Sequence, residues 1–347
     1  MHASDAKSET LIYSPDPVPM TNSAIKIVSA DIGGTHARFA IATIDAERIE
    51  LGEPVTLRTA DHVSFESAWH EFERLSRTAV PRELSIAIAG PVDDAELSLT
   101  NSQWRFNRER MVEELGLHSI TLLNDFGAVA HAVATVGESA LLHVAGPAGP
   151  LPQRGAVTIV GPGTGLGAAV LLRRSKDDYE ILETEAGHMD FSPLDTLEDR
   201  IVKELRKTFR RVSEERLVSG PGLRNIYDVL ALVEGKPASL RDETELWTAA
   251  LAQTDSLASL ALERFCMCFG AVAGDFALAH GASAVVIGGG IGKRLKDYLP
   301  GSGFADRFAA KGRFSSRLAA MPVKLITHPE PGLLGAAAAY AQKSHAA

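Results

Sequence analysis

The sequence predicts an α/β protein made of two similar α/β domains with a cleft between them. The main observation is a strand, a glycine-rich turn and a second strand that occur twice, as "VSADIGGTHARFAI" at residues 28–41 and "TIVGPGTGLGAAVL" at residues 158–171. Each copy is followed by further strands and helices, and the Gly/Pro-rich segment 144–155 separates the two halves. Such a repeat is typical of a duplicated domain, although two glycine-rich hairpins can also match by chance.

The first half of the chain begins with a hairpin. Residues 25–30 are apolar and rich in β-branched side chains, and the pattern resumes at 37–44, which predicts two strands around a turn. In the segment 65–79, Phe65, Trp69, Phe72 and Leu75 have helical spacing, which predicts a helix. The remaining elements expected in this half are strands at 83–92 and 119–123 and a helix at 126–136.

The second half repeats this organisation with more helices. Residues 156–174 predict a strand, a glycine-rich turn and a strand, and residues 196–209 predict an amphipathic helix with an acidic start. Helices are expected at 246–254 and at 256–281, the second ending at Gly281. The chain then predicts a strand running into glycines at 283–292, a strand at 323–328 and a terminal helix at 331–343.

The bulk composition excludes several classes of function. The chain has 347 residues, which favours about two domains, and its net charge of −9 disfavours nucleic acid as a partner. No apolar run reaches the ~20 residues of a membrane span, and residues 1–24 have no apolar signal segment and are expected to form a loose tail. A cytoplasmic protein follows by default. Cys266 and Cys268 are interpreted as buried free thiols, since a metal site needs more ligands.

The two glycine-rich turns are candidate phosphate sites. A tip of Gly and Thr exposes backbone N–H groups, and such a nest suits phosphate oxygens. Asp31 beside the first turn would repel a phosphate unless a cation lies between them, so Mg²⁺ is the natural inference. The alternative is an ordinary tight turn with a capping aspartate.

Two other nucleotide motifs fit less well. A Walker P-loop ends in Gly-Lys-Ser/Thr, which neither turn has. The segment Gly163–Ala168 matches the dinucleotide fingerprint G-x-G-x-x-A, with Glu183 about 20 residues further on, but that fingerprint must open a helix. Here an apolar segment typical of a strand follows, which disfavours a dehydrogenase.

Two strongly polar residues stand where a buried strand meets an apolar helix, in "LLNDFGA" at residues 122–128. Asn124 and Asp125 therefore lie where the chain leaves the core, at the edge of the expected cleft. Asp125 can be a general base or only the N-cap of the following helix. The residues alone leave both interpretations open.

Eight motifs in a fixed order carry a family resemblance: DIGGTHARFA, LTNSQW, LLNDFGAVA, GPGTGLGAA, EAGHMDFSP, ERLVSGPGL, GGGIG and PGLLGA. On these motifs the chain, from about residue 25 to 340, resembles the bacterial glucokinase family within the sugar kinase, actin and heat-shock ATPase superfamily. It is similar to the branch that lacks a zinc-binding cysteine cluster, since no cysteines stand soon after Glu-Ala-Gly-His at 185–188.

The resemblance implies two ribonuclease-H-like domains that close on sugar and nucleotide. The small domain would comprise residues 25–134 with 330–347, and the large domain residues 135–329. The implied activity is transfer of the ATP γ-phosphoryl group to the 6-hydroxyl of glucose, with Asp125 as the general base. The alternatives are a kinase of another hexose or a sugar-sensing protein with little turnover.

The resemblance also implies binding residues. The implied glucose ligands are Asn124, Asp125, Glu185, His188 and Glu215; Glu214 could be confused with the last. The implied ATP-binding residues are Ala30, Asp31, Ile32, Gly33, Gly34, Thr35, Gly163, Thr164, Gly165, Gly289 and Gly290. The implied cofactors and partners are Mg²⁺ on Asp31, directly or through water, ATP, glucose and a second copy in a homodimer. One departure is His36, where the family usually has Asn after Gly-Gly-Thr, and no role follows for it.

Overall fold

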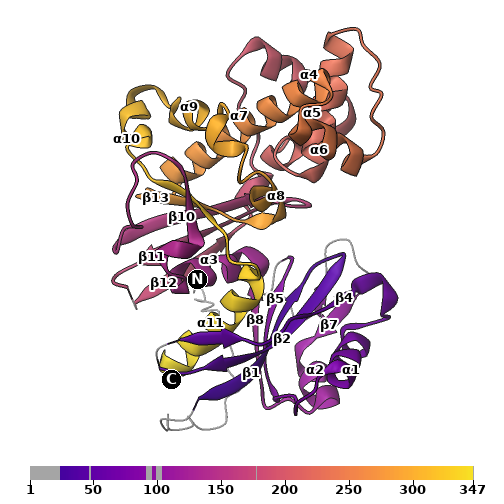
Figure 1. The fold of residues 1–347 in the computed structure, drawn as a ribbon, viewed down its shortest axis with the longest axis vertical. Coiled ribbons are helices and arrows are strands. Elements are labelled where there is room, and N and C mark those ends of the chain that lie inside the picture. Colours follow the sequence, from indigo (N-terminus) through magenta and orange to yellow (C-terminus); the bar gives the residue numbers. More distant parts are fainter. Residues whose placement is uncertain (1–23, 47, 91–95, 99–103, 177, 347) are drawn as a thin grey trace, which may run out of the picture.

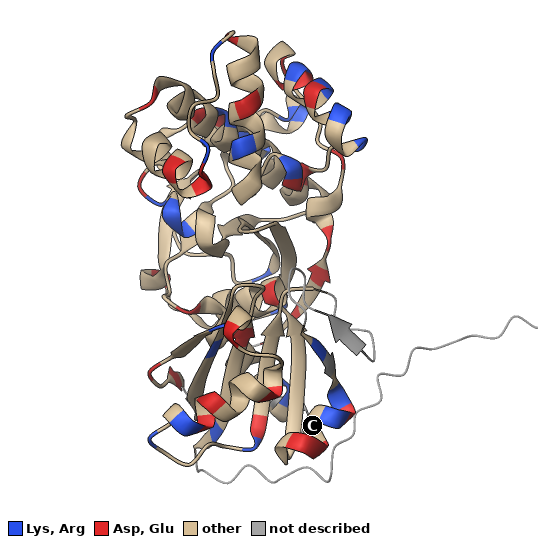
Figure 2. Ribbon diagram, turned by 90° about the vertical axis from the view of Figure 1, so that its right-hand side faces the viewer, with Lys and Arg blue, Asp and Glu red and all other residues tan. Residues whose placement is uncertain are grey.

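The computed structural model describes residues 24–346 except 47, 91–95, 99–103 and 177. The expected tail at 1–24 lies outside the described residues except for Ala24, and so does most of the motif LTNSQW. The chain is elongated, with one large sheet in each half, helix α3 near the middle and helix α11 running from there along the first half to the C-terminus (Figure 1). Figure 2 shows Lys and Arg interspersed with Asp and Glu along both halves of the chain.

The first sheet begins with the predicted hairpin. Its strands β1 and β2 are antiparallel, whereas β5 and β8 follow β1 in parallel. The strands, in their order across the sheet, are β3 (Ile49–Leu51), β2 (His36–Ile44), β1 (Ile25–Ile32), β5 (Glu83–Ile88) and β8 (Ser119–Asn124), with β4 (Val55–Arg58) also paired to β2. A separate short ribbon pairs β6 (Glu96–Ser98) with β7 (Arg105–Asn107).

The second sheet repeats this arrangement. Strands β10 and β11 form the second antiparallel hairpin, and β13 and β14 continue from β10 in parallel. The strands in order are β12 (Tyr179–Thr184), β11 (Leu166–Arg173), β10 (Gly155–Pro162), β13 (Ala284–Ile287), β14 (Val323–Ile326) and the added antiparallel β9 (Leu141–Ala145). The first five strands thus share the order and directions of the first sheet, so the predicted duplicated α/β fold is confirmed.

Helices cover the first sheet on both faces. Alternate residues of β1 point to opposite sides, so Val28 packs with the aromatic residues of α1 (Phe65–Leu75) and the apolar face of α2 (Arg108–Leu115). Ile27 packs on the other side against α11 (Pro331–Ala346). The spacing that predicted α1 reflects this burial, since Phe65, Trp69 and Phe72 are all buried.

Helix α3 (Asp125–Thr135) links the two sheets. It begins directly after β8 of the first sheet, but its side chains Phe126, Val129 and Val133 pack into the core of the second sheet. Its other side packs along α11, which itself lies on the first sheet. The start of α3 is therefore fixed by elements of both halves.

A helical layer completes the second half and buries a long core helix. Helix α7 (Ser256–Ala279) is, among the described residues, the one helix long and apolar enough to cross a membrane, but 72% of that apolar window is buried inside the protein, as in core helices of soluble proteins. Both cysteines lie on α7 and are buried and free, as expected. Around it lie α4 (Thr196–Phe209), α5 (Gly220–Val233), α6 (Glu243–Ala252), α8 (Gly289–Arg294), α9 (Phe304–Ala309) and α10 (Ser315–Ala319).

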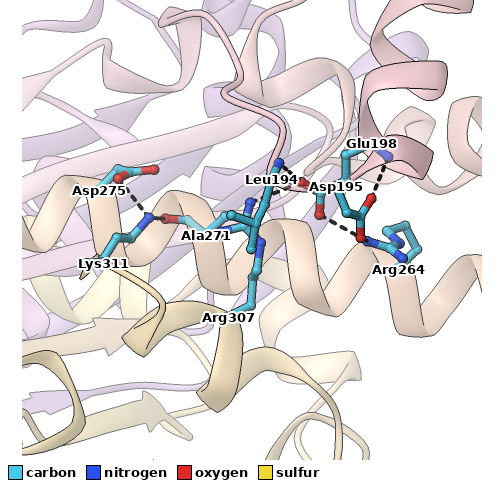
Figure 3. Close-up of polar contacts among 8 residues, drawn as sticks. All are labelled: Leu194, Asp195, Glu198, Arg264, Ala271, Asp275, Arg307 and Lys311. Carbon is cyan, nitrogen blue, oxygen red and sulfur yellow. Dashed lines mark hydrogen bonds and ion pairs between the residues drawn. The ribbon is translucent and has the colours of Figure 1, made fainter. Parts of the chain in front are cut away.

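A buried ion-pair network holds this helical layer together (Figure 3). The fully buried Glu198, in the first turn of α4, accepts hydrogen bonds from Arg264 of α7 at 3.1 Å and from Arg307 of α9 at 3.0 Å. Arg264 also binds Asp195 at 2.6 Å, and Glu198 accepts the backbone N–H of Leu194 at 2.7 Å. The network fixes the start of α4 to α7 and α9.

Candidate active site

Asp125 is the first residue of α3, and its neighbour caps the helix. The side-chain oxygen of Asn124 accepts the backbone N–H groups of Phe126 at 2.8 Å and Gly127 at 3.3 Å. Asn124 Nδ2 donates to the carbonyl of Gly90 at 3.3 Å, so its side chain is held at both ends. Asp125 Oδ1 also accepts the Phe126 N–H, at 2.8 Å. The N-cap position therefore belongs to Asn124, not Asp125.

The Asp125 carboxyl binds its proton unusually tightly. Burial raises its pKa from 3.8 to about 7, and the charges of Asp31, Glu185 and Glu183 add to the shift, while the Phe126 N–H opposes it. A pKa near neutrality suits a group that must take up a proton at neutral pH. The surroundings of Asp125 thus fit a general base.

Asp31 lies near the end of β1 in the first sheet, close enough to Asp125 for its charge to affect the pKa of Asp125. It lies opposite Arg38 in the hairpin, and Arg38 Nη1 contacts Asp31 Oδ2 at 3.4 Å. Burial and the nearby Glu330 raise the pKa of Asp31, while Arg38 lowers it. A Cβ on Gly332, in the first turn of α11, would come within 2.6 Å of Asp31 Oδ2, so the glycine admits the carboxylate.

The first glycine loop is a tight turn fixed from both sides. The Gly33 N–H donates to the carbonyl of His36 at 2.9 Å, and Thr59 bonds to Gly33 and to Thr35 at 3.1 and 3.0 Å. Thr35 at the tip is exposed. Ala30 and Ile32 are buried in β1, whereas Gly34 lies in the turn. His36 starts β2 and pairs with Arg58, and nothing in the structure gives it a further role.

The second glycine loop contacts Glu215. The Gly163 N–H donates to the carbonyl of Gly165 at 2.8 Å, and Glu215 Oε2 accepts the N–H of Leu166 at 3.1 Å. A side chain on Gly165 would overlap this carboxylate. Thr164, between the two glycines, is exposed at the tip of the loop. A residue with a side chain at position 165 would therefore require the Glu215 carboxylate to move off the loop.

The neighbouring Glu214 is placed differently. Its side chain is 4% exposed and its Oε2 has no hydrogen-bond partner in the described residues. Burial and the nearby Asp275 raise the pKa of Glu214 to about 8. Of the two acids, Glu215 thus lies on the loop and Glu214 lies in the core.

Glu185 and His188 lie in an exposed turn beside the second loop. His188 Nε2 is 3.9 Å from Glu185 Oε2, and both side chains are more than half exposed. The turn is η3 (Ala186–His188), and the Glu214 N–H donates to the carbonyl of Met189 at 2.9 Å, which joins η3 to η4 (Glu214–Arg216). The three sequence-predicted sugar ligands of the second half therefore lie on connected turns.

Gly289 and Gly290 open helix α8, which follows β13 after one residue, Gly288. Gly289 has φ +76°, a left-handed conformation that favours glycine, and its Cβ would come within 2.6 Å of the carbonyl of Pro162. A Cβ on Gly290 would meet nothing within 4 Å. Gly289 thus packs against Pro162, next to the second glycine loop, whereas there is space for a ligand or a side chain beside Gly290.

The predicted metal would have one protein carboxylate. Among the described residues no three His, Cys, Asp or Glu side chains form a group able to hold an ion. Mg²⁺ commonly keeps several waters and binds one or two carboxylates together with substrate phosphates. Asp31 beside a glycine loop, with the charge of Asp125 near it, fits that mode of binding.

Three contacts of this site were not predicted from the sequence. Arg38 and Gly332 both touch Asp31, and Glu183 reaches Asn124 from β12. The hairpin register could have revealed Arg38. If Gly34 and Thr35 are the two central residues of the turn, Arg38 lies directly across from Asp31 on the neighbouring strand. No local signal connects Glu183 or Gly332 to the site, because both come from distant parts of the chain.

Comparisons with known proteins show the family of this chain. The sequence model of the glucokinase family matches residues 28–343. A glucokinase of Zymomonas mobilis is 55% identical over 321 residues, covering 92% of this chain and 98% of the relative. A crystal structure of a glucokinase from an Antarctic psychrotroph has a TM-score of 0.78 at 33% identity, covering 90% of this chain and 98% of that one.

A more distant structure shares the fold. It is a ROK family glucokinase from Streptomyces griseus in complex with glucose and AMPPNP, with a TM-score of 0.59 at 21% identity, covering 90% of this chain and 98% of that one. The matched family model spans most of the described chain, and both glycine loops and Asp125 lie within it. This protein therefore belongs to the glucokinase family.

Proposed function

We propose that this protein is a glucokinase, which transfers the γ-phosphoryl group of ATP to the 6-hydroxyl of D-glucose and yields glucose 6-phosphate and ADP. The observation that carries the proposal is Asp125, a carboxyl with a pKa of about 7 at the start of a helix fixed by both sheets. The 55% identical relative named glucokinase supports the same reaction.

Asp125 acts as the general base. It accepts the proton of the 6-hydroxyl as that oxygen attacks the γ-phosphorus, and the bond to the β-phosphate oxygen breaks. Glu185, His188 and Glu215 hold the sugar hydroxyls, since carboxylates and imidazole accept and donate hydrogen bonds around the ring. Asn124 contributes the second N–H of its amide nitrogen, because the first donates to the carbonyl of Gly90 and the oxygen caps α3.

The nucleotide binds between the two glycine loops. Backbone N–H groups of Gly33–Thr35 and Gly163–Gly165 hold phosphate oxygens, and Gly289 and Gly290 approach the adenosine. The AMPPNP complex of the Streptomyces griseus protein supports ATP as the donor. Mg²⁺, held by Asp31 directly or through water, neutralises charge on the phosphates when it is bound.

The two halves act as lobes that close on the substrates. We infer a small lobe of residues 25–134 with 330–347 and a large lobe of residues 135–329. Closure brings the first glycine loop toward the second, where the start of α3 is already held, and excludes water. The enzyme works in the cytoplasm as a homodimer at the entry to glycolysis.

A coupled assay tests the function directly. The purified protein is given Mg²⁺-ATP and glucose, mannose, fructose or galactose, and ADP formation is followed. We expect glucose to have the highest kcat/KM, because a site built to bond each hydroxyl disfavours epimers. Activity on mannose or fructose without activity on glucose would instead support a kinase of another hexose, and no turnover with any sugar would support a sugar-sensing protein.

A further inference from the structure

The side chain of Glu183 reaches from the second sheet to the turn that carries Asp125. Glu183 lies near the end of β12, where it pairs with Ala169 of β11, and β12 lies beside α3 (Figure 1). Its Oε1 accepts the backbone N–H of Asn124 at 2.9 Å. Asn124 is the last residue of β8 in the first sheet. One carboxylate of the second sheet therefore fixes the residue directly before Asp125.

Gly127 leaves the space that this carboxylate occupies. A Cβ on Gly127 would overlap Glu183 Oε1 and would come within 2.9 Å of its Cδ and 3.0 Å of its Cγ. Glycine is unfavourable within a helix compared with alanine, yet it stands in the first turn of α3. The close approach of Glu183 gives a physical reason for glycine at this position.

The position also suits the charge of Glu183. The N-terminus of a helix carries partial positive charge from its free N–H groups, so a carboxylate is favourable there. Lys343 of α11 is close enough for Glu183 to affect its proton affinity. The start of the helix therefore favours the carboxylate while it bonds to Asn124, and the charge of Lys343 lies near enough to interact with it.

We propose that Glu183 is a positioning residue for phosphoryl transfer, which holds the Asn124–Asp125 turn in place through the Asn124 N–H, and that Gly127 is required to admit it. The inference rests on the proposed role of Asp125 as the base. Displacement of a catalytic group by about 1 Å can lower turnover about 100-fold, so we expect loss of this contact to lower kcat by roughly 10- to 100-fold.

A double-mutant cycle with full-length enzyme tests the proposal. The variants are Glu183→Ala, Gly127→Ala and the double variant, each measured for kcat, glucose KM and the backbone amide NMR signal of Asn124. Glu183→Gln retains an acceptor for the N–H and tests rescue. Glu180→Ala is the matched control, because Glu180 is an exposed acid of the same strand that pairs with Arg174 at 2.6 Å.

We expect Glu183→Ala and Gly127→Ala to lower kcat by similar factors and to shift the Asn124 amide signal. The double variant should lose no more than the worse single variant, since the added methyl acts by expelling Glu183. Glu183→Gln should keep kcat within about fivefold of wild type, and the control should match wild type. If Gly127→Ala fails to fold, the proposal is tested by whether Glu183→Ala lowers kcat and Glu183→Gln restores it.

Two results would overturn the proposal: turnover of Glu183→Ala within twofold of wild type, or losses that multiply in the double variant. Asp125→Asn is measured in parallel. Normal turnover in Asp125→Asn would remove the proposed base, whereas the Asn124 amide signal reports the contact of Glu183 independently of the chemistry. The two failures are therefore distinguishable.

Discussion

Replacing Asp125 with asparagine should stabilise the protein at alkaline pH. The pKa of Asp125 is about 7 in the folded protein and 3.8 in the unfolded chain, so the folded state binds more protons between these values. Stability contributed by this group is therefore lost as the pH rises from about 4 to 7, and the full cost of the buried charge is present at pH 8. Asparagine keeps the oxygen that accepts the Phe126 N–H but carries no charge.

The size of the effect follows from the shift. A difference of roughly 3 pKa units corresponds to about 4 kcal/mol at ~1.4 kcal/mol per unit. Because the Asp125 side chain keeps some contact with water, we expect about half of this, ~2 kcal/mol, or an increase in Tm of about 3 °C at pH 8 for a chain of this length. Near pH 4 the variant and the wild type should differ little, since the carboxyl is then protonated in the folded protein and already roughly 40% protonated in the unfolded chain.

Thermal denaturation of ligand-free protein from pH 4.5 to 8.5 measures this difference. Asp228→Asn, which removes an exposed charge on α5, is the control and should change stability by less than about 0.5 kcal/mol throughout. The reasoning would be refuted if Asp125→Asn were less stable than wild type at pH 8. A stability difference that did not change with pH would refute it equally.

Three further predictions concern the sugar site, the core and the metal. Glu215→Gln should weaken glucose binding by roughly tenfold or more in isothermal titration, because a hydrogen bond to a charged group is lost, and unchanged affinity would remove Glu215 from the sugar site. Glu198→Ala should destabilise the enzyme by about 3–5 kcal/mol, since it removes the carboxylate partner of the buried Arg307 and leaves Arg264 with Asp195 alone, and chemical denaturation with a midpoint like that of wild type would contradict this. Chelation with EDTA should abolish turnover, and added Mg²⁺ should restore it. The Asp31→Asn variant should require more Mg²⁺ than wild type for half-maximal rate, and an equal requirement would exclude Asp31 as a Mg²⁺ ligand.

The repeated parts of the fold were predictable because their signals are local. Two strands around a Gly-Thr tip need only alternation and glycine, and both hairpins lie where expected. Asp125 was identifiable since a strand leads directly into it and a helix follows. Helix α5 was not predicted, because Ser219, Gly220 and Pro221 resemble a turn; in the structure Ser219 caps the helix and the proline occupies its first turn.

The finer geometry of the site depended on contacts between distant residues. Asn and Asp are both good N-caps, and the choice of Asn124 depends on its extended backbone (φ −64°, ψ 151°), which the sequence does not encode locally. The bond between Glu183 and Asn124 spans 59 residues and two sheets. The reason for glycine at position 127 is likewise visible only when β12 is placed beside α3.

The most direct test of the account is turnover and glucose affinity of Asp125→Asn at saturating Mg²⁺-ATP. The account predicts that kcat falls at least ~100-fold, the usual scale for a positioned base, while isothermal titration still detects glucose binding. A variant that turns over at nearly the wild-type rate would contradict it.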